Sequence, residues 1–451
     1  MIDLLILLLL VIGIVVVTAK LKISPFLALL GAAFIGAFAF RLPVGEIIPT
    51  ITTAFGNTMG NIGLVILFGT MIGVILERSG GAIAMADALI KVLGTRFPTL
   101  TMSIIGYIVS IPVFCDSGYI ILNSLKKAMA ERAKVSLVAM SIALMTGLHA
   151  THTMVPPTPG PLAAASNLNV VDSLGLLIGL GLVVAAVSAG AALLYANRFL
   201  KKEVELLPVP AEEADVSYED LKTQYGKLPS GFMAFLPILL PILLICLSSI
   251  AKLPGAPMGD GGLAATLTFI GTPVIALAFG LVAAVFLLRG KGKLATFNTN
   301  ITDSIVLAAP ILLITSAGAA FGGVLGKSPI TAFLSDNLAT LGIGIAVPFI
   351  ISAALKTAQG SSTVAMVTTS AMLLPLLQPL GLATGAGPVL AVLAIGAGAM
   401  VVSHANDSYF WVVSQFSRIP TATAYRTLTP ATAVQGFAGF GAVWVLSLFM
   451  I

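Results

Sequence analysis

Residues 149–161 have the sequence His-Ala-Thr-His-Thr-Met-Val-Pro-Pro-Thr-Pro-Gly-Pro and lie inside an apolar stretch that extends from residue 135 to residue 165. Four prolines fall within the six positions 156 to 161. They end any helix there, because proline lacks an amide hydrogen and clashes with the preceding turn. Backbone that leaves its helix at membrane depth is tolerated only where it lines a cavity or is buried in protein. We therefore expect a broken transmembrane helix over 135–165, with function at its break.

The composition of the whole chain agrees with a membrane location. Of the 451 residues, 58% are hydrophobic and only 9% are charged, and the mean hydropathy is +1.08. A soluble globular protein carries roughly 25% charged residues. The core of a soluble protein cannot bury so much apolar surface. We therefore predict an all-α polytopic protein of the cell inner (plasma) membrane, with the lipid bilayer as its solvent. No nucleic-acid partner is expected, because the net charge of +5 in such a protein reports loop sidedness.

Polar breaks in apolar segments occur in the same order in two halves of the chain. We predict a first transmembrane repeat over 1–197, a cytoplasmic linker over 198–230 and a second repeat over 231–451. Each repeat would hold scaffold helices, a re-entrant helical hairpin and a broken helix. The hairpins are expected near 98–125 and near 340–376, and the broken helices at 135–165 and 385–413. Because the hairpins would open to opposite sides, this is an inverted repeat, an architecture in which substrate binds at the midplane between broken helices.

Uninterrupted apolar segments approach the roughly 20 residues that a spanning helix needs. They are 2–19, 24–40, 61–76, 171–196, 231–251, 263–288, 304–325 and 430–450. With the N-terminus outside, 19 of the 23 Lys and Arg residues face the cytoplasm, and the exceptions are Arg41, Lys252, Lys327 and Lys356. This positive-inside bias predicts both termini outside and the linker inside.

The break of the first hairpin holds an acidic residue. Asp116 follows a long uncharged run, and an ionised carboxylate at the bilayer centre costs about 3 kcal/mol on insertion scales, so such residues usually face a cavity. We expect Asp116 to carry a proton, against the alternative of a structural hydrogen bond. Ser117 and Gly118 beside it are candidate substrate-binding residues.

The proline-rich break follows two histidines. His149 and His152 are three residues apart, which suggests a metal site, but no Cys or Glu lies nearby to complete a ligand shell, and no metal is expected. Hydrogen bonding to substrate or hairpin, or simple burial, stays open for them. We take His152, Thr158 and Gly160 as candidate substrate-binding residues.

Two further breaks lie in the second half. A helix starting at Ser362 or Thr363 would direct its positive N-terminal end at the cavity and so favour an anion. The substrate candidates here are Gln359, Gly360, Ser361, Ser362 and Thr363. In the patch 403–410, Asn406 can donate to and accept from a hydroxylated ligand. Asp407 is the second intramembrane acid, and proton coupling and structural anchoring are both open for it.

At these motifs the chain resembles the gluconate permease family of the ion-transporter superfamily. The resemblance covers essentially the whole length and is most specific at Thr151-His152-x-x-x-Pro156-Pro157-x-Pro159-Gly160-Pro161 and at Asp116-x-Gly118. It implies uptake of gluconate, related hydroxy acids or D-serine with protons, an elevator-type motion and a homodimer. Gluconate-type members carry Glu at the position of Asp116 and His at the position of Thr158, so glycerate, lactate or 3-hydroxybutyrate are as reasonable as gluconate.

These observations predict a proton-coupled symporter for a small hydroxylated monocarboxylate such as gluconate, glycerate, lactate or 3-hydroxybutyrate. No phosphate-binding Gly-x-x-x-x-Gly-Lys loop, nucleophile elbow or His-Glu-x-x-His helix occurs, so neither ATP use, a cofactor nor an enzyme is expected. A cation/proton exchanger, sodium coupling and an amino-acid permease of the D-serine type are the alternatives.

Overall fold

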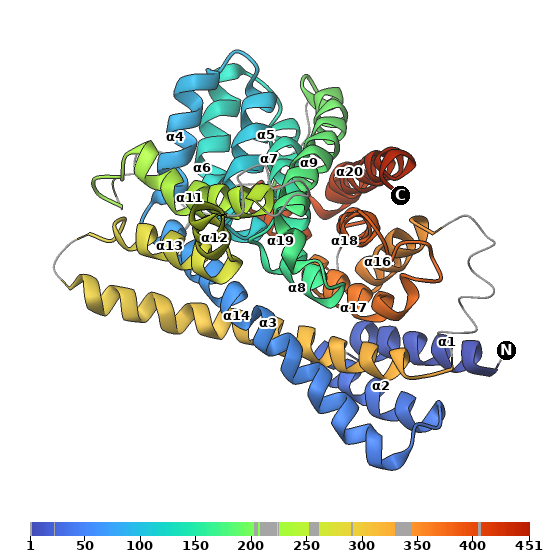
Figure 1. The fold of residues 1–451 in the computed structure, drawn as a ribbon. Helices are drawn as coiled ribbons and strands as arrows, with labels where there is room; N and C mark the ends of the chain where they lie inside the picture. The colour runs from blue at the N-terminus through green and yellow to red at the C-terminus, as the bar shows by residue number, and fades with distance from the viewer. Residues whose placement is uncertain are drawn as a thin grey trace.

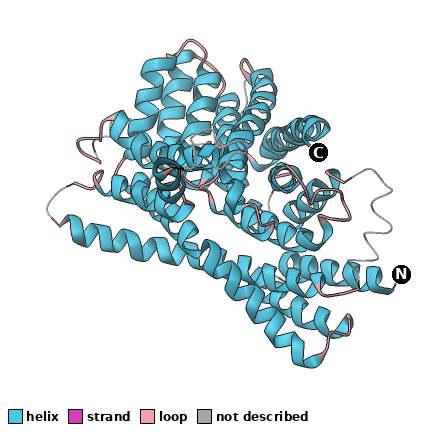
Figure 2. Ribbon diagram, in the orientation of Figure 1, coloured by secondary structure: helices cyan, strands magenta, loops and turns pink. Residues whose placement is uncertain are grey.

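The computed structural model describes residues 2–21, 23–202, 206–207, 223, 225–251, 261–289, 292–329, 344–404 and 407–451. Every regular element in these ranges is a helix, as Figure 2 shows. Most of the linker expected over 198–230 lies outside the described residues, as do Asn406 and the start of the hairpin expected near 340–376.

Five helical stretches of the described chain are long and apolar enough to cross a membrane, and two bent helix pairs would raise the number to seven. The five are Leu137–Asn167 (α7, Leu137–Met154, with α8, Pro159–Asn167), Val171–Phe199 (with α9, Leu174–Ala196), Gly231–Ser248 (in α11, Gly231–Ala251), Lys293–Gly326 (α14) and Thr421–Met450 (α20). The bent pairs are the two parts of α3 (Val44–Arg78), at 43°, and α12 (Gly262–Ile270) with α13 (Pro273–Val285), at 66°. The expected all-helical, polytopic class is confirmed.

The long helices α3 and α14 lie side by side along one edge of the molecule (Figure 1). Their ends show that they are antiparallel. Arg78, in the last turn of α3, forms an ion pair with Asp303 near the start of α14 at 2.6 Å. Glu46, in the first turn of α3, pairs with Lys327 just after the end of α14 at 3.2 Å.

Both helices extend well beyond the apolar segments 61–76 and 304–325 expected from hydropathy. The added turns of α3 carry threonines, which lower its hydropathy without preventing helix formation. Thr50, for example, donates its hydroxyl to the carbonyl of Glu46 at 2.7 Å, four residues earlier. The polar group is satisfied within the helix itself.

Two pairs of helices meet at short breaks on each side of the chain's midpoint. In the first half these are α5 (Pro98–Val109) with α6 (Cys115–Ala133), and α7 with α8. In the second half they are α16 (Ala346–Gln359) with α17 (Ser362–Leu373), and α18 (Gly387–Gly398) with α19 (Ser408–Phe416). α9 follows the first set and α20 follows the second, and these two helices pack against each other.

The two sets interlock. α17 packs against α8 and α19 packs against α6, so each second hairpin helix lies on a short helix from the other half. Within each half, glycine lets backbones approach closely. A Cβ on Gly147 would lie 2.3 Å from the carbonyl oxygen of Ser103, between α7 and α5, and one on Gly398 would lie 2.4 Å from that of Phe349, between α18 and α16. Small residues at such crossings are a common means of packing membrane helices.

The remaining helices lie outside this interlocked group. They are α1 (Ile2–Val15), which continues into a π-helical turn (Val16–Lys20), α2 (Pro25–Ala39) and α4 (Gly81–Leu93). α2 packs against α14, and α4 packs against α11 and α5. The most apolar part of Leu137–Asn167 is entirely buried inside the protein. The broken helix α7–α8 is therefore enclosed by protein rather than by lipid.

Candidate functional site

The N-terminal ends of four short or hairpin helices meet in two pairs at the helix breaks, α6 with α19 and α8 with α17. Ser408, the first residue of α19, donates its hydroxyl to Asp116 Oδ1 in the first turn of α6 at 3.4 Å. A Cβ on Gly160 of α8 would lie 2.9 Å from Met366 Sδ and 3.8 Å from Thr363 Cα, both in α17. Helix N-termini carry partial positive charge and free amides, so their convergence favours a negatively charged ligand.

Asp116 has no cationic partner in the described chain. Ser408 contacts its Oδ1, and the Cys115 thiol lies 3.7 Å from its Oδ2. The side chain is half-buried, as are Ser117 beside it and Ser361 to Thr363 at the start of α17. A carboxylate in this setting is neither neutralised by an ion pair nor sealed from solvent.

Asp407, in contrast, is buried and paired. Its Oδ2 lies 2.6 Å from Lys356 Nζ and accepts from the Ser403 hydroxyl at 2.5 Å. Its Oδ1 accepts from the Tyr409 amide at 3.0 Å and so caps α19. Asp407 therefore anchors structure, the second of the two roles that its position in the sequence left open, and a coupling role remains a proposal.

Lys356 was not among the site residues predicted from the sequence, which counted it only as one of the four cations that do not face the cytoplasm. Its side chain is only 1% exposed, and its ammonium also donates to the carbonyl of Gly360 four residues on. The position of Lys356 in the sequence could have indicated its role. It lies one turn before a polar break, in a chain with an intramembrane acid elsewhere, and a lysine at such a place needs an acidic partner.

The histidines line the same region. His149 Nε2 lies 3.0 Å from the Ser362 hydroxyl, and its ring meets Tyr409 edge-on at 5.6 Å. The His152 ring lies 5.8 Å from Phe114, next to the Asp116 turn. Both Nδ1 atoms are buried without a partner among the described residues. The same part of the chain contains no group of three His, Cys, Asp or Glu side chains placed to hold a metal ion.

Several candidate residues serve the local backbone. Thr158 is buried and donates to the carbonyl of Val155 at 2.7 Å. Ser361 caps α17 by accepting from the Val364 amide at 3.2 Å. Gly360 ends α16 in the left-handed conformation, with φ 92°, which glycine adopts without strain.

The other candidates differ in what surrounds them. Gly118 packs on Leu148, since a Cβ there would lie 2.8 Å from its side chain. Ser117 hydrogen-bonds Glu77 of α3. Asn406 and the side chain of Gln359 lie outside what is described.

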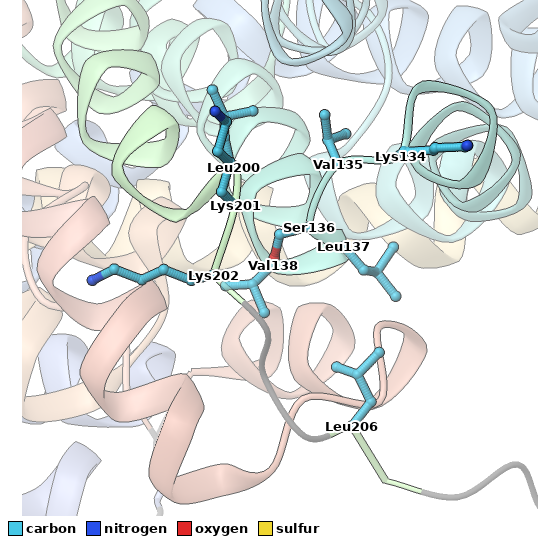
Figure 3. A pocket seen from close by; sticks show the side chains of 9 residues that line it. All are labelled: Lys134, Val135, Ser136, Leu137, Val138, Leu200, Lys201, Lys202 and Leu206. Carbon is cyan, nitrogen blue, oxygen red and sulfur yellow. The ribbon is translucent and has the colours of Figure 1, made fainter.

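A cavity of about 460 Å³ opens elsewhere, where α6, α7 and the end of α9 meet. Figure 3 shows its lining, in which Lys134 and Lys202 extend in opposite directions. These ammonium groups do not converge on one point.

Comparison with known proteins identifies the family of this chain. The family model described as "GntP family permease" matches residues 2–449. The chain belongs to this family. Relatives of the GntP-family permease include the gluconate permease of Pseudomonas aeruginosa (30% identical, covering 98% of this chain and 96% of the relative) and the inner membrane permease YgbN of Escherichia coli K12 (31%, 96% and 96%). The D-serine transporter DsdX of the same strain is 31% identical, with 97% and 96% covered.

The GntP-family permease shares its fold with two solved transporters. MtrF of Neisseria gonorrhoeae superposes with a TM-score of 0.65 at 14% identity, over 96% of each chain. YdaH of Alcanivorax borkumensis gives 0.62 at 16% identity, over 90% of each. The protein is thus a multi-pass inner-membrane transporter, and the expectation that it is not an enzyme is confirmed by its family.

A second buried cation of the permease also escaped the sequence analysis. Lys126 was expected at the cytoplasmic surface, yet it is fully buried. Its ammonium donates to Tyr119 Oη at 2.9 Å and to Ser417 Oγ at 2.6 Å, and it lies over the Tyr119 ring. Lys126 and Lys356 therefore say nothing about loop sidedness.

Proposed function

We propose that this permease imports a small hydroxylated monocarboxylate together with a proton. The observation that carries the proposal is the position of Asp116, a carboxylate without an ion-pair partner among the described residues, where the N-termini of α6 and α19 meet. Relatives named gluconate permease and D-serine transporter support a small organic solute.

The helix ends account for the anion. Each N-terminus contributes roughly half a positive charge. Ser362 and Thr363, half-buried at the start of α17, add hydroxyls. In the proposed arrangement they hold the substrate's carboxylate, while His152, Asn406 and Ser117 bind its hydroxyl groups.

Charge balance accounts for the proton. Lys356 offsets Asp407, whereas Asp116 is left without an ion-pair partner among the described residues. A substrate anion would add a second negative charge to a poorly solvated region, which is costly. A proton on Asp116 removes one of them, so the anion and the proton enter together.

The candidate acids differ in size and in hydroxyl groups. Gluconate-type members carry Glu and His at the positions of Asp116 and Thr158, so glycerate, lactate and 3-hydroxybutyrate are candidates on an equal footing with gluconate. An amino acid of the D-serine type is the second candidate, because a relative bears that name and because the Lys356–Asp407 pair offers both charges that a zwitterion needs.

For the architecture we propose an inverted repeat with an elevator-type motion in a homodimer. The repeated order of helix pairs and the antiparallel α3 and α14 support the repeat. Both termini would be outside and the linker 198–230 inside. In a variant without Cys115 and Cys246, a cysteine at Lys293 should resist a membrane-impermeant thiol reagent in intact cells, and rapid labelling would overturn this topology.

The decisive experiment is uptake into proteoliposomes of labelled gluconate, glycerate, lactate, 3-hydroxybutyrate and D-serine, with an inward proton gradient and no sodium. Uphill uptake of one acid that collapses with a protonophore is the expected result. Uptake that needs sodium, or ion flux without any organic solute, would replace the proposal with sodium symport or cation/proton exchange.

A further inference from the structure

We propose that Lys356 is the group that binds the substrate's carboxylate, and that it does so by exchanging Asp407 for the substrate. This inference rests on the proposed function and names the charged residue of its site. A buried ion pair beside the anion-favouring helix ends is the observation that carries it.

The ammonium of Lys356 lies at the edge of the break. It donates to the carbonyl of Gly360, the residue at which α16 ends. The next three residues, 361 to 363, are half-buried and begin α17, whose N-terminus points into the break. A substrate carboxylate held by the N-terminus of α17 would therefore lie close to the ammonium of Lys356.

The contacts of Asp407 would allow Lys356 to leave it while its other hydrogen bonds stay in place. Its two oxygens have separate partners: Oδ1 caps α19 through the Tyr409 amide at 3.0 Å, and Oδ2 meets Lys356 at 2.6 Å. Ser403 also bonds Oδ2, at 2.5 Å. If the ion pair breaks, the cap and the Ser403 bond can stay, so α19 keeps its start while the ammonium becomes available.

The exchange needs a proton. A buried carboxylate that loses its cation is strongly destabilised, and Asp116 lies near enough to Asp407 to repel it. A proton shared by these two acids restores the charge while Lys356 holds the substrate. The titratable groups that face the pair are Cys115 and Asp116 from α6, His149 and His152 from α7, and Tyr409 from α19.

A fixed ammonium should distinguish an acid from its uncharged amide. We would measure binding of glycerate and glyceramide, and of lactate and lactamide, to the purified full-length protein by isothermal titration calorimetry. A hydrogen bond to a charged group is worth about 1.5–3 kcal/mol, so the wild type should prefer the acid by tenfold or more.

The informative variant is the double substitution Lys356→Gln with Asp407→Asn, which removes both charges and leaves none buried and unpaired. Its preference for the acid should fall about tenfold, to what the helix N-termini alone provide. Asp407→Asn alone should keep the preference and bind the acid more tightly, because Lys356 no longer has a charged competitor. The matched control is Lys327→Gln with Glu46→Gln, which removes an ion pair whose side chains are 50% and 56% exposed, and it should behave as the wild type.

Failure of the proposed function and failure of the assignment to Lys356 would give different results. If wild-type protein binds and transports none of the acids, the proposed function and this inference fall together. If the wild type prefers the acid and the double variant keeps that preference, only the assignment to Lys356 is overturned. Monodisperse elution of each variant shows that the comparison is made on folded protein.

Discussion

The hydroxyl of Ser408 donates to Asp116 Oδ1 at 3.4 Å, across 292 residues of sequence. This contact joins the first turn of α6 to the first turn of α19 and so links the two halves of the chain at their breaks. The acid that we assign to the proton therefore lies between the halves. A motion of one half against the other would change what surrounds it.

Asp116→Asn should abolish accumulation against a gradient, because the amide cannot carry the proton that offsets the substrate's charge. Exchange of substrate across the membrane should persist, since it moves no net proton. Uphill uptake and counterflow in proteoliposomes measure the two separately. Normal uphill uptake by this variant would remove Asp116 from coupling.

Thr158→His should change the order in which hydroxy acids compete for uptake, because it restores the residue type of gluconate-type members beside the break. It removes one hydrogen bond, to the carbonyl of Val155, worth about 1 kcal/mol, and the larger ring adds an overpacking cost of about 1–3 kcal/mol at this buried site, so elution and unfolding temperature are checked first. Competition profiles with gluconate, glycerate and lactate provide the measurement. An unchanged profile in folded protein would place Thr158 outside the pocket.

Gly147→Ala should destabilise the protein, because the new methyl group would lie 2.3 Å from the carbonyl oxygen of Ser103 and would push α7 from α5. Overpacking of this kind costs about 1–3 kcal/mol. The unfolding temperature of the purified protein is the readout. Gly190→Ala in α9 is the control, since nothing lies within 4 Å of its Cβ position, and equal stability of the two variants would contradict the packing argument.

Lys126→Met should leave the unfolding temperature unchanged or raise it, because methionine fills a similar volume without a buried charge to desolvate. Ser417→Ala should lower it, since the ammonium then loses its acceptor at 2.6 Å, at a cost of about 1–3 kcal/mol. If Lys126→Met instead abolished uptake while the protein stayed folded, Lys126 would belong to the transport path.

The sequence by itself determined the solvent of this protein and the places where its helices stop. Low charge and high hydropathy require lipid, and the run of four prolines at 156–161 ends α7 through local geometry, whereas single prolines such as Pro310 are accommodated inside helices. Such effects act within a few residues, and they can therefore be predicted from one chain. The lengths of α3 and α14 could not be predicted from hydropathy, because threonine hydroxyls inside a helix look polar in composition but are satisfied by the helix itself.

Only the tertiary structure decided which of the two intramembrane acids is paired. Asp407 and Asp116 are alike in sequence, each a lone acid in an apolar segment. The packing of α16 brings Lys356 within 2.6 Å of Asp407, 51 residues away, and no described cation comes to Asp116. An ion pair depends on where separate helices lie in space, and the preference of each residue for its own helix does not contain that information.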